Sequence, residues 1–131
     1  MTRVVIVDDR ASIRRGLSAL FEVAPDLDVC GTADCGEAGL TLATTLDPDV
    51  VVMDLSMPGI GGVAATRAIV TSGCSSRVLI LSWAWSERGL AEVVKAGARG
   101  YVAKSEGPER LVVAVRAVAA GQLHFDRPVG R

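Results

Sequence analysis

The sequence has little that would mark a secreted, membrane-spanning or nucleic-acid-coating protein. It contains three cysteines, one histidine and 4% aromatic residues among 131 residues. The cysteines are odd in number and lack metal-ligand spacing, so we expect small thiols in a reducing cytosol. No apolar run approaches the roughly 18 residues that a bilayer crossing needs, and no signal peptide precedes the first strand-like run. Acidic and basic residues nearly cancel, 15 against 14, which excludes a chain-wide basic surface.

What the sequence does have is an ordinary globular composition in the length of one domain. Hydrophobic residues make up 50% of the chain and charged residues 22%. This composition excludes disorder as the main state. We expect the domain to span residues 1–121. Residues 122–131 have no clear period and are interpreted as the start of an interdomain linker or a C-terminal tail.

Short β-branched runs alternate along the chain with longer segments of helical periodicity. The predicted strands are residues 3–8, 28–32, 49–54, 77–82 and 99–104. The predicted helices run through residues 13–21, 37–46, 62–71, 87–96 and 108–120. Strict alternation implies an α/β fold with a parallel sheet covered by helices on both faces. Right-handed crossovers and short connections favour a five-stranded doubly wound sheet in the order 2-1-3-4-5.

Polar residues end four of these strands, where doubly wound sheets bind their ligands. Asp8 and Asp9 end the first strand, Asp54 the third, Ser82 the fourth and Lys104 the fifth. Since the carboxyl ends of parallel strands meet at one edge, three carboxylates, a hydroxyl and an ammonium should converge there.

Three carboxylates at one edge repel one another, so at least one pKa should rise unless a cation is present. Carboxylates together with waters and a phosphoryl oxygen suit Mg²⁺, which keeps much of its hydration. The lysine supplies positive charge for a phosphate, and an aspartate carboxylate can act as a nucleophile toward phosphoryl groups. The residues therefore predict a Mg²⁺-dependent aspartyl-phosphate site.

In this order, the residues resemble the receiver domain of two-component response regulators, which has a flavodoxin-like fold. The resemblance covers essentially the whole chain. It depends on residues 7–9, residues 54–59 with Gly62, Ser82, and residues 100–104. Residues 14–17, 97–101 and 115–121 are similar to the NarL/LuxR-type subfamily.

The resemblance implies a phospho-acceptor and a set of metal ligands. Asp54 would accept the phosphoryl group. Asp9, Asp54 and the backbone carbonyl of Ser56 would hold Mg²⁺ directly, and Asp8 would hold it mainly through water. No other cofactor is implied.

The resemblance also implies a switch. Lys104 would pair with the phosphoryl oxygens, and Ser82 would donate its hydroxyl to the phosphoryl group once formed. Tyr101 would then turn inward and repack the face made by the fourth helix, the fifth strand and the last helix. The Ser-Trp-Ala-Trp run at residues 82–85 is unusual for such a domain. Trp83 and Trp85 are interpreted either as a partner contact or as packing over the loop.

The implied function is regulatory rather than enzymatic, although the domain would assist its own phosphorylation and dephosphorylation. Its partners would be a sensor histidine kinase and, on phosphorylation, a second copy of the chain. In the subfamily a helix-turn-helix DNA-binding domain follows the receiver, and here the chain ends about where the linker would run. Control of transcription and contact with DNA would therefore come through a domain absent from this chain. We expect a cytoplasmic protein without membrane contact.

Two other hypotheses remain open at this point. The chain could be a receiver-shaped interaction module that never needs phosphate. It could also be a small nucleotide-binding enzyme, because residues 59–64 match the dinucleotide fingerprint G-x-G-x-x-A. That match follows the third strand rather than the first, which weakens it, and no phosphate-binding loop of the P-loop type exists.

Overall fold

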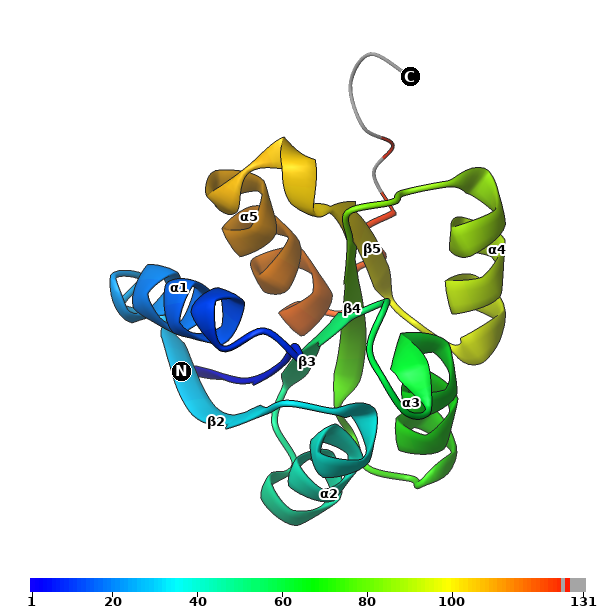
Figure 1. Ribbon diagram of the computed structural model, residues 1–131. Helices are drawn as coiled ribbons and strands as arrows, with labels where there is room; N and C mark the ends of the chain where they lie inside the picture. The colour runs from blue at the N-terminus through cyan, green and yellow to red at the C-terminus, as the bar shows by residue number, and fades with distance from the viewer. Residues whose placement is uncertain (126, 128–131) are drawn as a thin grey trace.

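The computed structural model describes residues 1–125 and 127. Five parallel strands form one sheet in the order β2-β1-β3-β4-β5, which confirms the predicted order (Figure 1). The strands are β1 (Thr2–Val7), β2 (Leu27–Ala33), β3 (Val50–Asp54), β4 (Arg77–Ser82) and β5 (Gly100–Ala103). The helices are α1 (Ala11–Glu22), α2 (Gly36–Leu46), α3 (Gly61–Thr71), α4 (Glu87–Ala96) and α5 (Pro108–Ala119), with a 3₁₀ turn η1 (Lys104–Glu106) before α5.

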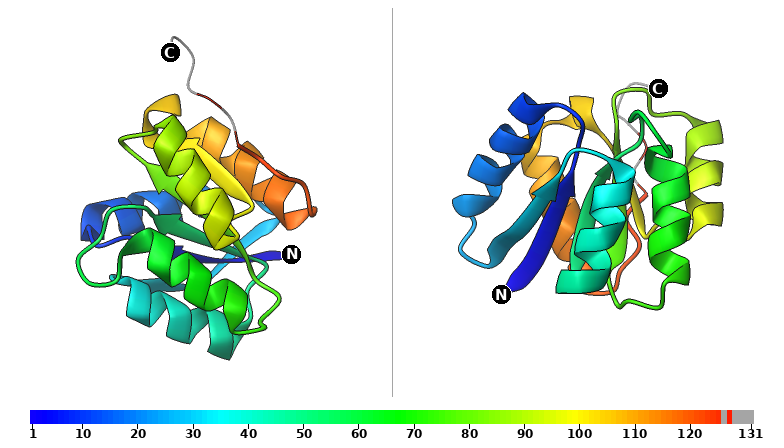
Figure 2. Two further views of the ribbon diagram at one scale, coloured as in Figure 1. Left: turned by 90° about the vertical axis from the view of Figure 1, so that its right-hand side faces the viewer. Right: turned by 60° about the horizontal axis from the view of Figure 1, so that its bottom comes forward.

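Helices cover both faces of the sheet, as the views in Figures 1 and 2 show. Helices α1 and α5 pack on one face, and α2, α3 and α4 pack on the other. Successive residues of a strand point to opposite faces. Along β1, Val4 and Ile6 belong to one hydrophobic cluster, while Val5 and Val7 belong to the other. A strand buried on both faces needs apolar residues throughout, and this is why β1 and β3 contain so many valines.

Local signals end the elements close to the predicted positions. Ser86 precedes α4 and its hydroxyl accepts the N–H of Gly89 at 2.9 Å, while Gly97 closes the helix in the left-handed conformation. The predicted fifth strand is one residue too long at its carboxyl end, because its pairing with β4 stops at Ala103 opposite the last residue of β4. Lys104 consequently begins the turn η1.

Residues 122–125 lie against β5 rather than away from the domain. The N–H of His124 donates to the carbonyl of Arg99 at 3.0 Å, and the N–H of Tyr101 donates to the carbonyl of His124 at 2.9 Å. Phe125 packs against the hydrophobic cluster under α3 and α4. The guanidinium of Arg127 forms a bidentate ion pair with Glu87, in which Nε donates to Oε1 at 2.6 Å and Nη2 donates to Oε2 at 2.9 Å. The rest of the predicted linker, residue 126 and residues 128–131, lies outside the described residues.

The state of the cysteines and the length of the helices can also be described. All three cysteines, Cys30, Cys35 and Cys74, are partly buried free thiols. In the part of the chain that the structure describes, the helices are too short or too polar for a bilayer crossing.

Candidate functional site

The candidate site lies at the carboxyl edge of the sheet, where β1 and β3 are neighbours. Val7 pairs with Met53, so the residues that follow β1 come to lie beside the last residue of β3. Asp8 and Asp9 therefore meet Asp54 across the strand order reversal, where doubly wound sheets place their sites. The structure brings these three residues together as the sequence predicts.

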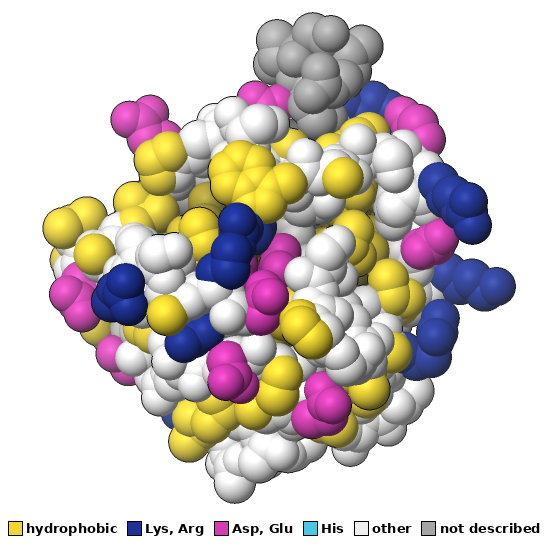
Figure 3. All heavy atoms as spheres, viewed as in Figure 1, with side chains coloured by type: hydrophobic (Ala, Val, Ile, Leu, Met, Phe, Trp, Pro, Cys, Tyr) yellow, Lys and Arg dark blue, Asp and Glu magenta, His cyan; other side chains and the backbone are white. Residues whose placement is uncertain are grey.

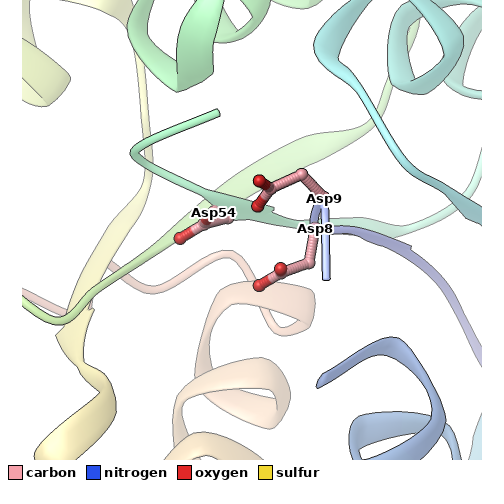
Figure 4. A group of neighbouring side chains, drawn as sticks. All are labelled: Asp8, Asp9 and Asp54. Carbon is pink, nitrogen blue, oxygen red and sulfur yellow. The ribbon is translucent and has the colours of Figure 1, made fainter. Parts of the chain in front are cut away.

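The three carboxylates form a tight group. Each residue offers an oxygen, and these oxygens all lie within 4.8 Å of one another. Figure 4 shows the carboxylates gathered at the ends of β1 and β3. Asp8 and Asp54 are buried, with 1% and 5% of their surface exposed, whereas Asp9 is exposed. Such a group fits a hard divalent cation, which prefers oxygen ligands and keeps waters on its open side.

Lys104 joins two of the carboxylates from the far end of the sheet. Its Nζ lies 2.8 Å from Oδ1 of Asp54 and 3.0 Å from Oδ2 of Asp8. Only 6% of the lysine side chain is exposed, so solvent screens these ion pairs little. The ammonium thus offsets part of the negative charge at the edge of the sheet.

Despite this lysine, the pKa of Asp54 is raised above its ordinary value of 3.8. Burial is the main cause, because removal from water disfavours the charged carboxylate. The charges of Asp8 and Asp9 raise the pKa further, and the hydrogen bond and charge of Lys104 lower it in part. The site therefore has negative charge left to neutralise, and the raised pKa agrees with the prediction from three adjacent carboxylates.

A hollow of about 240 Å³ opens above the acidic group. It is lined by Asp9, Arg10, Asp54, Ser56, Ser82, Trp83 and Ala84. Ser82 is buried at the end of β4, and its Oγ accepts the N–H of Ala84 at 3.0 Å. A hydroxyl that accepts one hydrogen bond still has its proton to donate. The hollow is thus lined by two carboxylate residues, two serines and one basic residue, Arg10.

Tyr101 lies behind the hollow, and its ring is fully buried in this structure. Its Oη accepts the N–H of Ser86 at 3.3 Å, and its ring stacks on Trp85 with centroids 5.3 Å apart. The resemblance seen in the sequence implies an inward turn of Tyr101 only after Ser82 has moved. Here the inward position is already occupied. One reason is Gly89 of α4, because a Cβ at this residue would lie 2.5 Å from Oη.

Sequence reasoning missed two contributors to the site. The backbone N–H of Arg10 donates to Oδ1 of Asp8 at 2.9 Å, and its side chain lies 3.9 Å from the same oxygen. A basic residue directly after an Asp-Asp pair was the available signal. Gly89 gave no signal, because the space that it leaves for Tyr101 depends on how α4 packs on β5.

The glycines at residues 59–62 have a structural explanation that needs no nucleotide. A Cβ on Gly62 would lie 2.5 Å from the carbonyl oxygen of Asp54 and 2.8 Å from Cα of Leu55. The N–H of Gly62 also donates to the carbonyl of Leu55 at 3.0 Å. The start of α3 therefore approaches the end of β3 so closely that only glycine fits there.

The chain is similar to known proteins in sequence and in structure. A model of the response regulator receiver domain matches residues 4–116. The response regulator GacA of Pseudomonas aeruginosa is 39% identical over 131 residues, which cover 100% of this chain and 61% of that protein. The nitrate/nitrite response regulator protein NarL of Escherichia coli is 36% identical over 120 residues, which cover 92% of this chain and 56% of that protein. The chain thus spans little more than half the length of these curated relatives.

Solved structures agree with these sequence matches. A crystal structure of a LuxR-family two-component response regulator from an Aurantimonas species has a TM-score of 0.89 at 37% identity and covers 93% of this chain and 87% of that chain. The signal receiver domain of the putative response regulator NarL from Mycobacterium tuberculosis has a TM-score of 0.89 at 30% identity and covers 92% of this chain and 98% of that chain.

Proposed function

This chain belongs to the response regulator receiver domain family, and from this we propose that Asp54 accepts a phosphoryl group from a phosphohistidine of a sensor kinase. A carboxylate oxygen of Asp54 forms the new bond to phosphorus. The bond from phosphorus to the histidine nitrogen breaks, and its electron pair stays on the imidazole. The observation that carries this proposal is the position of Asp54, buried at the end of β3 between Lys104 and two further carboxylates.

The acidic group is proposed to hold Mg²⁺. Asp9, Asp54 and the backbone carbonyl of Ser56 would contact the ion, and Asp8 would hold it mainly through water. Two observations support this assignment. One oxygen from each of the three carboxylates lies within 4.8 Å of the others, and the pKa of Asp54 is raised. When bound, Mg²⁺ supplies positive charge that offsets the negative charge of the phosphoryl oxygens.

Lys104 and Ser82 are proposed to act on the phosphoryl group from two sides. The ammonium of Lys104, already 2.8 Å from Asp54, would pair with a phosphoryl oxygen. The hydroxyl of Ser82 would donate to another. Catalysis of this kind is mostly positioning and charge stabilisation. The domain would thereby assist its own phosphorylation and dephosphorylation while acting as a regulatory module rather than as an enzyme on other substrates.

The readout is proposed to pass through Tyr101 to the face of α4, β5 and α5. A new phosphoryl charge would draw Ser82 toward it, and the contacts of Tyr101 with Ser86 and Trp85 would adjust. The altered face would change homodimerisation. The named relatives are longer than this chain. We further propose that the receiver domain acts in the cytoplasm and controls a DNA-binding output domain of a longer regulator.

The experiment is phosphorylation by a small phosphodonor, acetyl phosphate, with and without Mg²⁺. The unaltered chain should gain an acid-labile phosphoryl group in Mg²⁺ only, and Asp54→Asn should gain none. Asp28→Asn, an exposed aspartate of β2, is the matched control and should be labelled like the unaltered chain. Undiminished labelling of Asp54→Asn would contradict the acceptor assignment. No labelling of any protein, with no change of tryptophan fluorescence on adding Mg²⁺, would favour a module that works without phosphate.

A further inference from the structure

Trp83 occupies an unusual place for a large hydrophobic side chain. It directly follows Ser82 at the end of β4, and 59% of its surface is exposed. Figure 3 shows hydrophobic, basic and acidic side chains close together on the face viewed there. A single exposed hydrophobic residue is ordinary in itself. The contacts of this one are not.

Two cations lie against the indole ring. Cζ of Arg10 lies 5.9 Å from the ring centroid, and Nζ of Lys104 lies 5.7 Å from it. Both distances are within the range of a cation–π attraction. Each cation also contacts a carboxylate, since Lys104 pairs with Asp54 at 2.8 Å and Arg10 lies 3.9 Å from Asp8. The ring is therefore fixed to the same charges that form the site.

The indole also borders two cavities. On one side is the polar hollow of about 240 Å³ above Asp54. On the other is an apolar groove of about 180 Å³, lined by Ile13 and Leu17 of α1 and by Pro108 and Leu111 of α5. Trp83 lines both. Because the ring is part of the wall of the hollow that contains Asp54, its loss would widen that hollow.

We propose that Trp83 is a positioning residue that shields the phosphoryl group on Asp54 from water and so lengthens its lifetime. The inference rests on the proposed function of Asp54. In hydrolysis, a water oxygen forms a bond to phosphorus while the bond to Asp54 breaks. The electron pair of that bond returns to the carboxylate, and inorganic phosphate leaves with both protons of the water, as H₂PO₄⁻. As a wall of the hollow, the indole restricts the space through which this water reaches phosphorus.

The test is the rate of phosphoryl loss after acetyl phosphate has been removed, measured on the full chain. Trp83→Ala should lose the group about two- to five-fold faster, the factor to which one exposed cation–π contact corresponds. Trp83→Phe keeps an aromatic face for Arg10 and Lys104 and should return most of the lifetime. Arg10→Ala, which removes one of the two cations, should move the rate in the same direction as Trp83→Ala.

Two controls separate shielding from a general loss of structure. The cation–π contacts of Trp83 are with Arg10 and Lys104, which are not proposed Mg²⁺ ligands, so Mg²⁺ affinity by calorimetry should change less than the rate of phosphoryl loss in Trp83→Ala, and far-ultraviolet circular dichroism should remain that of the folded domain. An unchanged or slower rate in Trp83→Ala would overturn the proposal, as would equal acceleration in Trp83→Phe or a matching loss of Mg²⁺ affinity. If the unaltered chain took up no phosphoryl group at all, the proposed function itself would fail, which is a different result.

Discussion

The ammonium of Lys104 lies 2.8 Å from Oδ1 of Asp54, although the two residues are 50 positions apart in the sequence. The same ammonium reaches Oδ2 of Asp8 at 3.0 Å. Lys104, which directly follows β5, thus connects the end of β5 to the ends of β1 and β3. The stability of the domain and the chemistry of its acidic group consequently depend on the same contact.

Replacement of this lysine should destabilise the metal-free domain. Lys104→Met leaves two buried carboxylates without their cation, and we expect a loss of about 1–3 kcal/mol in the free energy of unfolding. Urea denaturation at neutral pH measures the change, and Mg²⁺ should recover part of it. Lys95→Met, at an exposed position of α4, is the control and should leave stability unchanged. Equal effects of the two substitutions would show that the buried pairing contributes nothing.

Stability without metal should depend on pH through Asp54. Its pKa in the folded state is raised above the ordinary value of 3.8, mainly by burial. As pH rises above 3.8, the unfolded chain gives up this proton first, so the folded state loses stability until the pH has passed the folded pKa. Asparagine has no such proton. As pH rises from 3.8 through the folded pKa of Asp54, Asp54→Asn should therefore become more stable relative to the unaltered chain. The difference in the free energy of unfolding should be smallest below pH 3.8.

Thermal unfolding in metal-free buffers across acidic to neutral pH measures this difference. Asp28→Asn should give a curve parallel to that of the unaltered chain. In excess Mg²⁺ the advantage of Asp54→Asn should shrink, because the ion stabilises the chain that keeps its carboxylate. A difference that grows toward low pH would have the wrong sign and would refute the assignment.

The inward position of Tyr101 should depend on the missing side chain at residue 89. Gly89→Ala would place a Cβ 2.5 Å from Oη of Tyr101, so either the ring or α4 must move. We expect a loss of about 1–3 kcal/mol, although alanine is the better helix former. Gly16→Ala is the matched control in α1, where nothing lies within 4 Å, and it should gain about 0.5–1 kcal/mol.

The double variant Gly89→Ala with Tyr101→Phe tests the cause of that loss. Phenylalanine lacks the hydroxyl that the new Cβ would meet, and its nearest ring atom, Cζ, would be 3.3 Å away, while the contact with Oγ of Ser86 at 3.1 Å remains. The second substitution should therefore restore the part of the stability that is lost to contact with Oη. If it restores none, steric contact with Oη is not the reason for the loss.

Gly62 should tolerate no side chain. Its nearest neighbours are backbone atoms of Asp54 and Leu55, which cannot rotate away as a side chain can. Gly62→Ala should cost about 3 kcal/mol and should slow phosphorylation, because β3 carries the acceptor. Denaturation and phosphodonor labelling measure the two effects, with Gly16→Ala again as the control. Normal stability would reopen a ligand-binding explanation for this glycine.

Much of this arrangement could be predicted from the sequence because it depends on periodicity and chain order. Alternating strands and helices, with right-handed crossovers, lead to one simple sheet order. The same order places Asp8, Asp9 and Asp54 at one edge. The sequence also suggested Lys104 as the nearby cation, but its contact with Asp8 depends on how far η1 lets the side chain reach across the sheet.

Other features could not be foreseen, because they depend on packing between distant segments. The burial of Tyr101 requires the gap at Gly89, and no local pattern encodes such a gap. The pairing of residues 122–125 with β5 rests on two backbone hydrogen bonds and gives no alternation that a pattern could reveal. Trp83 was recognised as unusual, yet its place at the border of two cavities emerged only from the folded chain.

The strip of chain beside β5 has a consequence for self-association. An outermost strand with unsatisfied N–H and C=O groups is a template onto which another molecule can add a strand. Here His124 already takes up the N–H of Tyr101 and the carbonyl of Arg99. A second copy that approaches this side would find these two backbone groups already hydrogen bonded, which disfavours the addition of a strand at Arg99 and Tyr101.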